Sequence, residues 1–239
     1  AEITNLDELE AAARDGHLRR LPGMGEKSEQ RILAGIAALK RRSSRMLLGT
    51  ARPIGLRWLA WLRDQPGLIN AEMAGSLRRW KATIGDLDLV ASAKDPAAVM
   101  AAFVQHPEVE RVQSHGENKS SVQMSNGLNV QLWLQPEEKF ASLLQFVTGS
   151  KDHNVRLREH AQRLGYSLSE HGLITPQGEE LRFSVEEDLY RALGLAWIPP
   201  ELREDNGEIQ AAREDRLPDL ITLADLRAEL HSHSTWSDG

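Results

Sequence analysis

The most constraining feature of the sequence is the stretch from Gly75 to Val90, which reads GSLRRWKATIGDLDLV. It opens with a glycine and a serine, continues through a basic cluster, and closes on two aspartates within an apolar run. Because alternate residues of a β-strand share a face, a strand here would place Asp86 and Asp88 on one side and Leu87 and Leu89 in the core. The stretch therefore predicts a strand that presents two neighbouring carboxylates to a cleft.

The chemistry of this stretch suits a metal and a phosphate chain. Two adjacent carboxylates repel each other, and a hard divalent cation relieves that repulsion. Mg²⁺ typically takes one or two carboxylates together with substrate phosphates. The backbone N–H groups of Gly75 and Ser76 and the charges of Arg78, Arg79 and Lys81 suit a triphosphate. The alternative is a surface strand with two solvated aspartates, because the D-x-D pattern is short.

A second motif lies near the N-terminus, where residues 17–28 read HLRRLPGMGEKS between two predicted helices. Gly23 and Gly25 flank Met24 and predict a tight loop. The N–H groups of this loop would lie at a helix N-terminus, where a phosphate is favoured. The alternative is an ordinary helix that ends on a glycine.

Composition limits the class of protein. The chain has 239 residues, no cysteine and a net charge of −6. The lack of cysteine excludes a disulfide framework and thiolate metal sites, and it fits a reducing cytoplasm. No apolar run approaches the roughly 20 residues of a membrane span. Basic residues gather between Arg14 and Lys81, whereas the chain is acidic from Glu186 onward, which fits a phosphate-binding front half; a solvated charged surface is the alternative.

Hydrophobic periodicity and turn signals predict alternating helices and paired strands, and therefore an α+β fold with helices on one face of a sheet and the site on the other. Asn126-Gly127 between two alternating runs predicts a hairpin whose second strand turns Asn129, Gln131 and Trp133 toward the cleft. Helices are predicted at 1–15, around 32–39, at 53–62, 97–103 and 136–147, from 151, and at 186–193. Strands are predicted at 69–73, 84–91, 109–113, 168–174 and 181–183, and an irregular acidic segment from 198.

These motifs resemble a known family. Gly-Ser, two arginines and Gly-Asp-x-Asp resemble the nucleotidyltransferase signature of family X DNA polymerases, the polymerase-β-like enzymes. Leu-Pro-Gly-Met-Gly at residues 21–25 resembles the helix-hairpin-helix motif, which holds DNA through its backbone. The similarity to the bacterial branch covers nearly the whole chain. It implies helix-hairpin-helix fingers at 1–50, a nucleotidyltransferase palm with a mixed sheet at 51–147, a small α+β thumb at 148–218, and at 219–239 a linker and the start of a truncated polymerase-and-histidinol-phosphatase (PHP) domain.

The resemblance also implies site residues. Asp86 and Asp88 would bind Mg²⁺ (or Mn²⁺), and Gly75, Ser76 and Arg79 would hold the β- and γ-phosphates of an incoming deoxynucleoside triphosphate. The further nucleotide-binding residues would be Phe146, Thr148, Gly149, Lys151 and Asn154. The DNA-binding residues would be Gly23, Met24, Gly25, Lys27, Arg41, Arg42 and Arg158.

The sequence departs from the family at Gln131, where the family has a third aspartate. A glutamine amide is a weaker Mg²⁺ ligand and is not a base, so it weakens the metal that would activate the primer hydroxyl. Phe146 and Val147 replace the family's usual Tyr and Phe. At the C-terminus, His231, His233 and Asp238 resemble the opening motif of a PHP metal site, but this chain lacks the other ligands; a frayed tail is the alternative.

The resemblance implies a DNA-binding, template-directed DNA polymerase core of the gap-filling repair type, with activity impaired by Gln131. Its partners would be gapped or primer–template DNA and a deoxynucleoside triphosphate. A cytoplasmic monomer without membrane contact is expected. Two alternatives remain: a catalytically inactive DNA- and nucleotide-binding module, and an untemplated nucleotidyltransferase that modifies another substrate. The helix-hairpin-helix motif and the Thr-Gly-Ser-Lys sequence at 148–151 argue against the latter.

Overall fold

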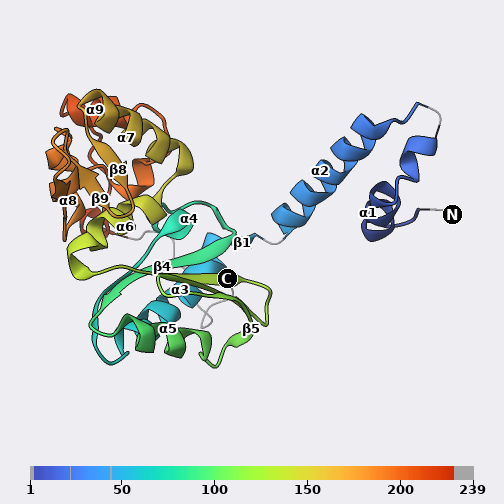
Figure 1. Cartoon of the computed structure of the whole chain (residues 1–239), viewed down its shortest axis with the longest axis horizontal. Helices are drawn as coiled ribbons and strands as arrows, with labels where there is room; N and C mark the ends of the chain where they lie inside the picture. Colours follow the sequence, from blue (N-terminus) through green and yellow to red (C-terminus); the bar gives the residue numbers. More distant parts are fainter. Residues whose placement is uncertain (1–2, 22, 44, 229–239) are drawn as a thin grey trace.

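The computed structural model describes residues 3–21, 23–43 and 45–228, without the side chains of residues 37–43. Three parts follow one another along the chain (Figure 1). We call them the helical unit (residues 3–43), the sheet lobe (residues 45–148) and the C-terminal lobe (residues 149–217). Helices α1 and α2 stand clear of the other two parts in Figure 1.

The helical unit contains α1 (Leu6–Arg14), the 3₁₀ helix η1 (Leu18–Arg20) and α2 (Glu26–Ser43). The side chain of Asn5 accepts a 2.9 Å hydrogen bond from the backbone of Glu8 and caps α1. The buried carboxylate of Glu29 on α2 accepts hydrogen bonds from the backbone and the Nε of Arg19, at 2.8 and 2.6 Å. These bonds fix the segment before α2, and the predicted helix–loop–helix order is confirmed.

The first helix of the sheet lobe begins earlier than predicted. Helix α3 (Leu48–Arg63) extends five residues upstream of Pro53, the expected start. Pro53 lies in the second turn, where it costs the helix one backbone hydrogen bond. The preceding strand β1 (Met46–Leu47) pairs with β3 (Thr83–Ile84). The segment before residue 50 is therefore bound to the sheet lobe, and position 50 lies inside a helix.

Five strands form the main sheet, in the order β2-β4-β7-β6-β5. The strands are β2 (Leu68–Met73), β4 (Asp86–Ala93), β5 (Val109–His115), β6 (Lys119–Met124) and β7 (Asn129–Leu134). Strands β4 and β7 run parallel, and the other neighbours are antiparallel. The mixed sheet and the β6–β7 hairpin are both as predicted.

One face of this sheet carries the main core. Helices α3 and α5 (Pro96–Val104) cover it, and Leu87, Leu89 and Leu132 on β4 and β7 are completely buried there. The predicted alternation along both strands is confirmed.

The sequence predicted helices on one face of the sheet only. That prediction is wrong, because a helix also packs on the opposite face. After η2 (Glu137–Lys139), helix α6 (Phe140–Thr148) packs on Val90, which shares a face with the two aspartates. Phe140, Leu143 and Leu144 form this contact. The polar face of the sheet is therefore covered at one end, and α6 leads into the C-terminal lobe.

The C-terminal lobe contains α7 (Lys151–Arg163), β8 (Ser167–Ser169), β9 (Gly172–Ile174), β10 (Glu180–Leu181), α8 (Glu186–Ala192), η3 (Pro200–Leu202) and α9 (Glu208–Arg213). Its strands form an antiparallel sheet, and Leu157, Leu189 and Tyr190 lie in its core. Helix α9 was not predicted. It begins after Gly207, and the Glu208 side chain accepts backbone hydrogen bonds from the two residues before that glycine, which orders the acidic segment.

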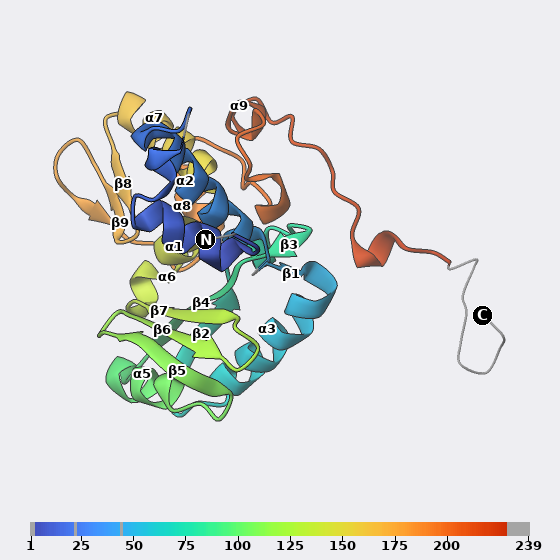
Figure 2. The ribbon, with the colours of Figure 1, turned by 90° about the vertical axis from the view of Figure 1, so that its right-hand side faces the viewer.

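The chain beyond Leu217, which still packs on the core of the C-terminal lobe, runs away from both lobes and contains the short helix η4 (Leu223–Asp225) (Figure 2). None of the helices in the described residues is both long and apolar enough to cross a membrane.

Candidate active site

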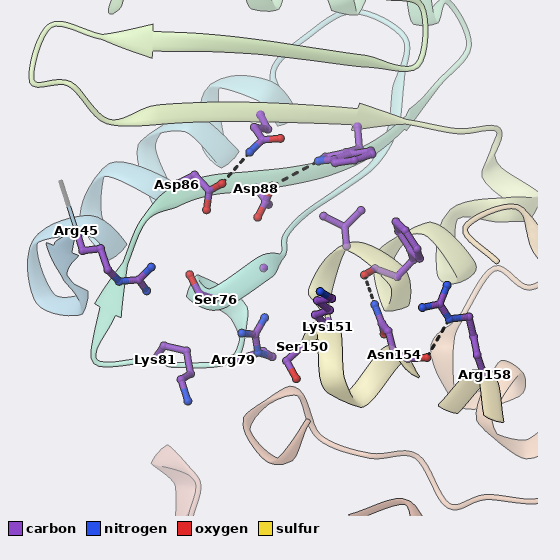
Figure 3. A pocket seen from close by; sticks show the side chains of 16 residues that line it. Arg45, Ser76, Arg79, Lys81, Asp86, Asp88, Ser150, Lys151, Asn154 and Arg158 are labelled. Carbon is purple, nitrogen blue, oxygen red and sulfur yellow. Dashed lines mark hydrogen bonds between the residues drawn. The ribbon is translucent and has the colours of Figure 1, made fainter. Parts of the chain in front are cut away.

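A cavity of about 580 Å³ lies where the sheet lobe meets the C-terminal lobe. The sheet, α4 (Gly75–Arg78), the end of α6 and the start of α7 supply its walls (Figure 3). Residues that the sequence assigned to nucleotide, metal or DNA line most of it. They are Gly75, Ser76, Arg79, Asp86, Asp88, Gln131, Phe146, Gly149, Lys151, Asn154 and Arg158.

Strands β4 and β7 form the carboxylate wall. Their register sets Asp88 beside Gln131, and the Nε2 of Gln131 donates a 2.8 Å hydrogen bond to Oδ2 of Asp86. The indole Nε1 of Trp133 donates a 3.4 Å hydrogen bond to Oδ1 of Asp88. Burial and then the charge of Asp86 raise the pKa of Asp88 to about 7. Two carboxylates this close favour a cation between them and a phosphate group.

Position 75 requires a glycine, because the backbone there lies very close to the side chain of Asp88. Gly75 has a φ of +58°, and a Cβ atom there would lie 2.2 Å from Oδ2 of Asp88. The backbone N–H of Ala74 also donates a 2.8 Å hydrogen bond to the carbonyl of Asp88. The start of α4 is therefore held against the carboxylate wall, and Ser76 faces the cavity (Figure 3).

The oxygen ligands of this wall fit one Mg²⁺ ion better than two. Asp86 and Asp88 supply two carboxylates, which is what Mg²⁺ commonly takes when nucleotide phosphates complete its shell. Gln131 adds only a neutral amide, and its nitrogen faces Asp86. Among the residues that the structure describes, no group of three or more His, Cys, Asp or Glu side chains could hold a metal.

A cationic wall faces the carboxylates across the cavity (Figure 3). The Nε of Arg79 donates a 2.8 Å hydrogen bond to Oε1 of Glu204, and its Nη1 donates to the carbonyl oxygen of Thr148. Lys81 lies 3.4 Å from the same oxygen of Glu204. Arg45 donates a 2.9 Å hydrogen bond from Nε to the hydroxyl of Thr83 and lines the cavity beside the sheet.

The third wall is the N-terminal half of α7. A cis peptide bond joins Gly149 to Ser150, and the Ser150 hydroxyl accepts a 3.2 Å hydrogen bond from the backbone of His153 as the cap of α7. Asn154 is held at both ends of its amide, because it accepts from Gln145 at 2.8 Å and donates to the Phe146 carbonyl at 2.7 Å. Lys151 and Arg158 are exposed on the cavity side of α7.

One predicted nucleotide residue lies behind the wall. Thr148 is completely buried and does not line the cavity; its hydroxyl accepts a 2.9 Å hydrogen bond from Nη1 of Arg78. It thus joins α6 to α4, and its contact with nucleotide stays a prediction.

The remaining predicted residues lie away from the cavity or outside the description. Gly23, Met24, Gly25 and Lys27 are exposed in the helical unit. The side chains of Arg41 and Arg42, and all of His231, His233 and Asp238, lie outside the described residues.

Four further residues line the cavity that the sequence did not assign to ligand binding: Arg45, Trp133, Val147 and Ser150. Of the two other cations that the sequence assigned to a triphosphate beside Arg79, Lys81 lines the cavity and Arg78 does not. Alternation had already turned Trp133 toward the cleft. Arg45 carried no local signal, because only the pairing of β1 with β3 brings it to the cavity.

The chain is similar to known DNA polymerases. Residues 143–204 match the family model described as DNA polymerase beta thumb. The chain is 34% identical over 240 residues to the DNA polymerase/3′-5′ exonuclease PolX of Bacillus subtilis, covering 99% of this chain and 42% of that protein. It is 27% identical over 168 residues to DNA polymerase lambda of Rattus norvegicus, covering 58% of this chain and 29% of the relative. The chain thus spans less than half the length of these relatives.

A solved structure shows the same fold. The crystal structure of Leishmania infantum polymerase beta in a ternary P/T complex superposes with a TM-score of 0.60, at 20% identity, over 84% of this chain and 89% of that one. The alternating carboxylate strand, the match of residues 143–204 to the thumb model and the similarity to PolX over 99% of this chain lead to one conclusion. The chain belongs to family X of the DNA polymerases.

Proposed function

We propose that this chain is the core of a template-directed DNA polymerase of the gap-filling type, which transfers a deoxynucleotide to a primer 3′-hydroxyl. One observation carries the proposal: Asp86 and Asp88 line the same cavity as Arg79, on opposite walls. This is the arrangement that phosphoryl transfer needs, because little covalent chemistry falls to the protein and catalysis consists of positioning and charge stabilisation.

Each wall has a proposed role. Asp86 and Asp88 hold Mg²⁺, which neutralises phosphate charge when it is bound. The N–H groups at the start of α4, the hydroxyl of Ser76 and the guanidinium of Arg79 hold the β- and γ-phosphates. Arg45 and Lys81, which also line the cavity, add positive charge at that end.

The base and sugar lie toward α6 and α7 in this proposal. Phe146, Gly149, Lys151 and Asn154 contact the nucleotide, whereas Arg158 lies along the template. Support comes from the cavity, which all five line together with the aspartates. Gln145 and the Phe146 carbonyl already hold the amide of Asn154 in place, so this side chain needs little ordering when a ligand binds.

In this proposal the helical unit binds the DNA. The exposed loop of Gly23, Met24 and Gly25 directly precedes α2, and a helix N-terminus favours a backbone phosphate. Arg41 and Arg42, which follow in the sequence, add positive charge. We propose a sequence-independent grip on gapped or primer–template DNA.

One observation favours a second candidate function, a module that binds DNA and nucleotide with little catalysis. Gln131 stands where a third carboxylate would be needed, and its amide occupies an oxygen of Asp86. A protein with this wall keeps a place for the nucleotide-bound ion, whereas the ion that would activate the primer hydroxyl has weak ligands.

Three features of the larger protein remain proposals. They are a PHP domain that begins at His231, His233 and Asp238, a monomeric state, and a cytoplasmic location.

The experiment that separates the candidates uses this chain with a one-nucleotide gapped duplex, the complementary deoxynucleoside triphosphate and Mg²⁺ or Mn²⁺. A polymerase core weakened by Gln131 extends the primer slowly with the templated nucleotide, Gln131→Asp speeds this extension, and Asp88→Ala abolishes it. A binding module retains the DNA and the nucleotide without extension, even as Gln131→Asp. Addition that ignores the template base would contradict both and would support an untemplated transferase.

A further inference from the structure

The phosphate-binding arginine of the sheet lobe is held by a carboxylate from the far end of the C-terminal lobe. Glu204 lies 125 residues after Arg79, and its Oε1 accepts the 2.8 Å hydrogen bond from Nε of Arg79. The same oxygen lies 3.4 Å from Nζ of Lys81. Both cations line the cavity, whereas Glu204 does not. Glu204 therefore contacts the cationic wall from behind.

The donors that Arg79 uses leave it available to a ligand. Its Nε is bonded to Glu204 and its Nη1 to the Thr148 carbonyl. Among the residues that the structure describes, Nη2 of Arg79 has no hydrogen-bond partner, and the Arg79 side chain is only 12% exposed. A guanidinium is a rigid planar fork, so two fixed donors set the direction of the remaining N–H groups. Glu204 thus orients the arginine without covering the end that faces the cavity.

The segment that carries Glu204 is itself fixed. The neighbouring Arg203 is completely buried and forms a 2.7 Å ion pair with Glu186, which also pairs with Arg78 at 2.7 Å. The Arg203 carbonyl accepts a 3.0 Å hydrogen bond from the backbone of Ser150, a residue of the cavity wall.

The other end of the segment is held by Glu208. Its carboxylate accepts hydrogen bonds from the backbones of Asp205 and Asn206, at 3.1 and 2.7 Å, and lies 2.7 Å from Nδ1 of the buried His153 on α7. A carboxylate on a backbone anchored on both sides is pre-organised, so it can fix the direction of Arg79 before the ligand arrives.

We propose that Glu204 is a positioning residue that couples the C-terminal lobe to the phosphate-binding arginine Arg79. The inference rests on the proposed function, because it assumes that Arg79 binds the triphosphate. Glu204 sets the direction of the guanidinium, and the affinity for the polyphosphate depends on the C-terminal lobe being seated against α4. Removal of Glu204 should therefore weaken nucleotide binding, although it also removes a negative charge from beside a site for an anion.

The test measures binding of a non-hydrolysable deoxynucleoside triphosphate analogue, with Mg²⁺, to the chain bound to one-nucleotide gapped DNA, by calorimetry. Glu204→Ala should weaken nucleotide binding about tenfold, the scale of one charge-assisted hydrogen bond, and leave DNA affinity unchanged. Glu204→Asp keeps the charge but shortens the reach, so it should also weaken binding. Glu204→Gln keeps a hydrogen-bond acceptor and should stay within about threefold of the parent.

Asp205→Asn is the matched control, because it removes the same charge from the next residue. Asp205 pairs with Arg156 at 3.2 Å on the α7 side, and its φ of +59° is one that asparagine tolerates. This variant should bind nucleotide like the parent. Equal or tighter binding by Glu204→Ala and Glu204→Asp would overturn the inference, and so would an equal loss in Asp205→Asn. A parent chain that binds no nucleotide on DNA would instead overturn the proposed function.

Discussion

The side-chain amide of Gln131 donates a 2.8 Å hydrogen bond to Oδ2 of Asp86, from one parallel strand to its neighbour. In the proposed function, the amide lies at the position where a third carboxylate would complete the metal site. It brings no negative charge, and it occupies an oxygen that would otherwise be free for a cation. The difference between this wall and a three-carboxylate wall is therefore both electrostatic and geometric.

The contact between Gly75 and Asp88 predicts that Gly75→Ala disables the site. A Cβ atom would clash with Oδ2 of Asp88, and the φ of +58° costs an alanine roughly 1–2 kcal/mol. Asp88 must move, so binding of the Mg²⁺–nucleotide complex should fall at least tenfold while DNA binding is kept. Calorimetry measures both affinities. Gly127→Ala, at a positive φ but with open space around it, is the control for backbone strain alone. Unchanged nucleotide affinity in Gly75→Ala would contradict this account of the contact.

Arg78, the last residue of α4, and Arg79, which follows it, should differ in their effects. Arg79→Ala should weaken nucleotide binding more than DNA binding, because its guanidinium faces the cavity. Arg78 faces the buried Glu186, so Arg78→Ala should mainly lower the free energy of unfolding, by about 3 kcal/mol. Nucleotide titration and urea denaturation of both variants check this. The assignment is wrong if Arg79→Ala leaves nucleotide affinity intact.

Acid should loosen the contact between the lobes. Burial alone would raise the pKa of Glu186, but the charges and hydrogen bonds of Arg203 and Arg78 lower it from the ordinary 4.5 to about 2. A carboxyl whose pKa is lowered by folding stabilises the protein above the unfolded value and loses that effect as the pH falls toward the folded value. The contribution is about 3 kcal/mol and should disappear between about pH 5 and pH 2.

Glu186→Gln tests this pH dependence. At pH 7 the variant should be less stable than the parent, because two arginines lose their charged partner. The difference in unfolding free energy, measured by urea denaturation, should shrink steadily as the pH falls below 5. A difference that stays constant down to pH 3 would show that Glu186 is not held ionised by these arginines.

DNA binding should depend steeply on salt. If the helical unit holds backbone phosphates, the logarithm of the affinity falls linearly with the logarithm of salt concentration. Removing the charges of Arg41 and Arg42 together should make the slope shallower by about 2, one unit for each lost phosphate contact. Fluorescence anisotropy with two unrelated gapped duplexes checks the slope and the lack of sequence preference. An affinity that does not change with salt would rule out phosphate contacts.

Local alternation explains what the sequence could predict. The period of two along β4 and β7 placed Leu87 and Leu132 in the core and Asp88 and Gln131 on the cavity face, because a strand leaves no other choice once one face is buried.

Long-range contacts explain what the sequence could not predict. Glu204 is one of many acidic residues in the C-terminal part of the sequence. Nothing in the local pattern identifies it as the partner of Arg79. Arg45 reaches the cavity only through the two-residue pairing of β1 and β3. Thr148 is turned inward because Arg78 binds its hydroxyl. In each case the decisive partner lies far away in the sequence.

If the cavity of Asp86 and Asp88 is a polymerase site limited by Gln131, the variant Gln131→Asp should extend a primer faster than the parent chain. The parent chain, Gln131→Asp, Gln131→Asp with Asp88→Ala, and Gln131→Asn should be compared on one-nucleotide gapped DNA with Mg²⁺. The asparagine variant is neutral and shorter, so it controls for loss of the hydrogen bond to Asp86 without added charge.

We expect little or no extension by the parent and a gain of about 10²–10⁴-fold in Gln131→Asp, the scale of general-base assistance. The asparagine variant should gain nothing, and the added Asp88→Ala should abolish the gain. Fast extension by the parent that Asp88→Ala removes would show that Gln131 does not limit the site. Extension that survives Asp88→Ala would show that these aspartates are not the active site.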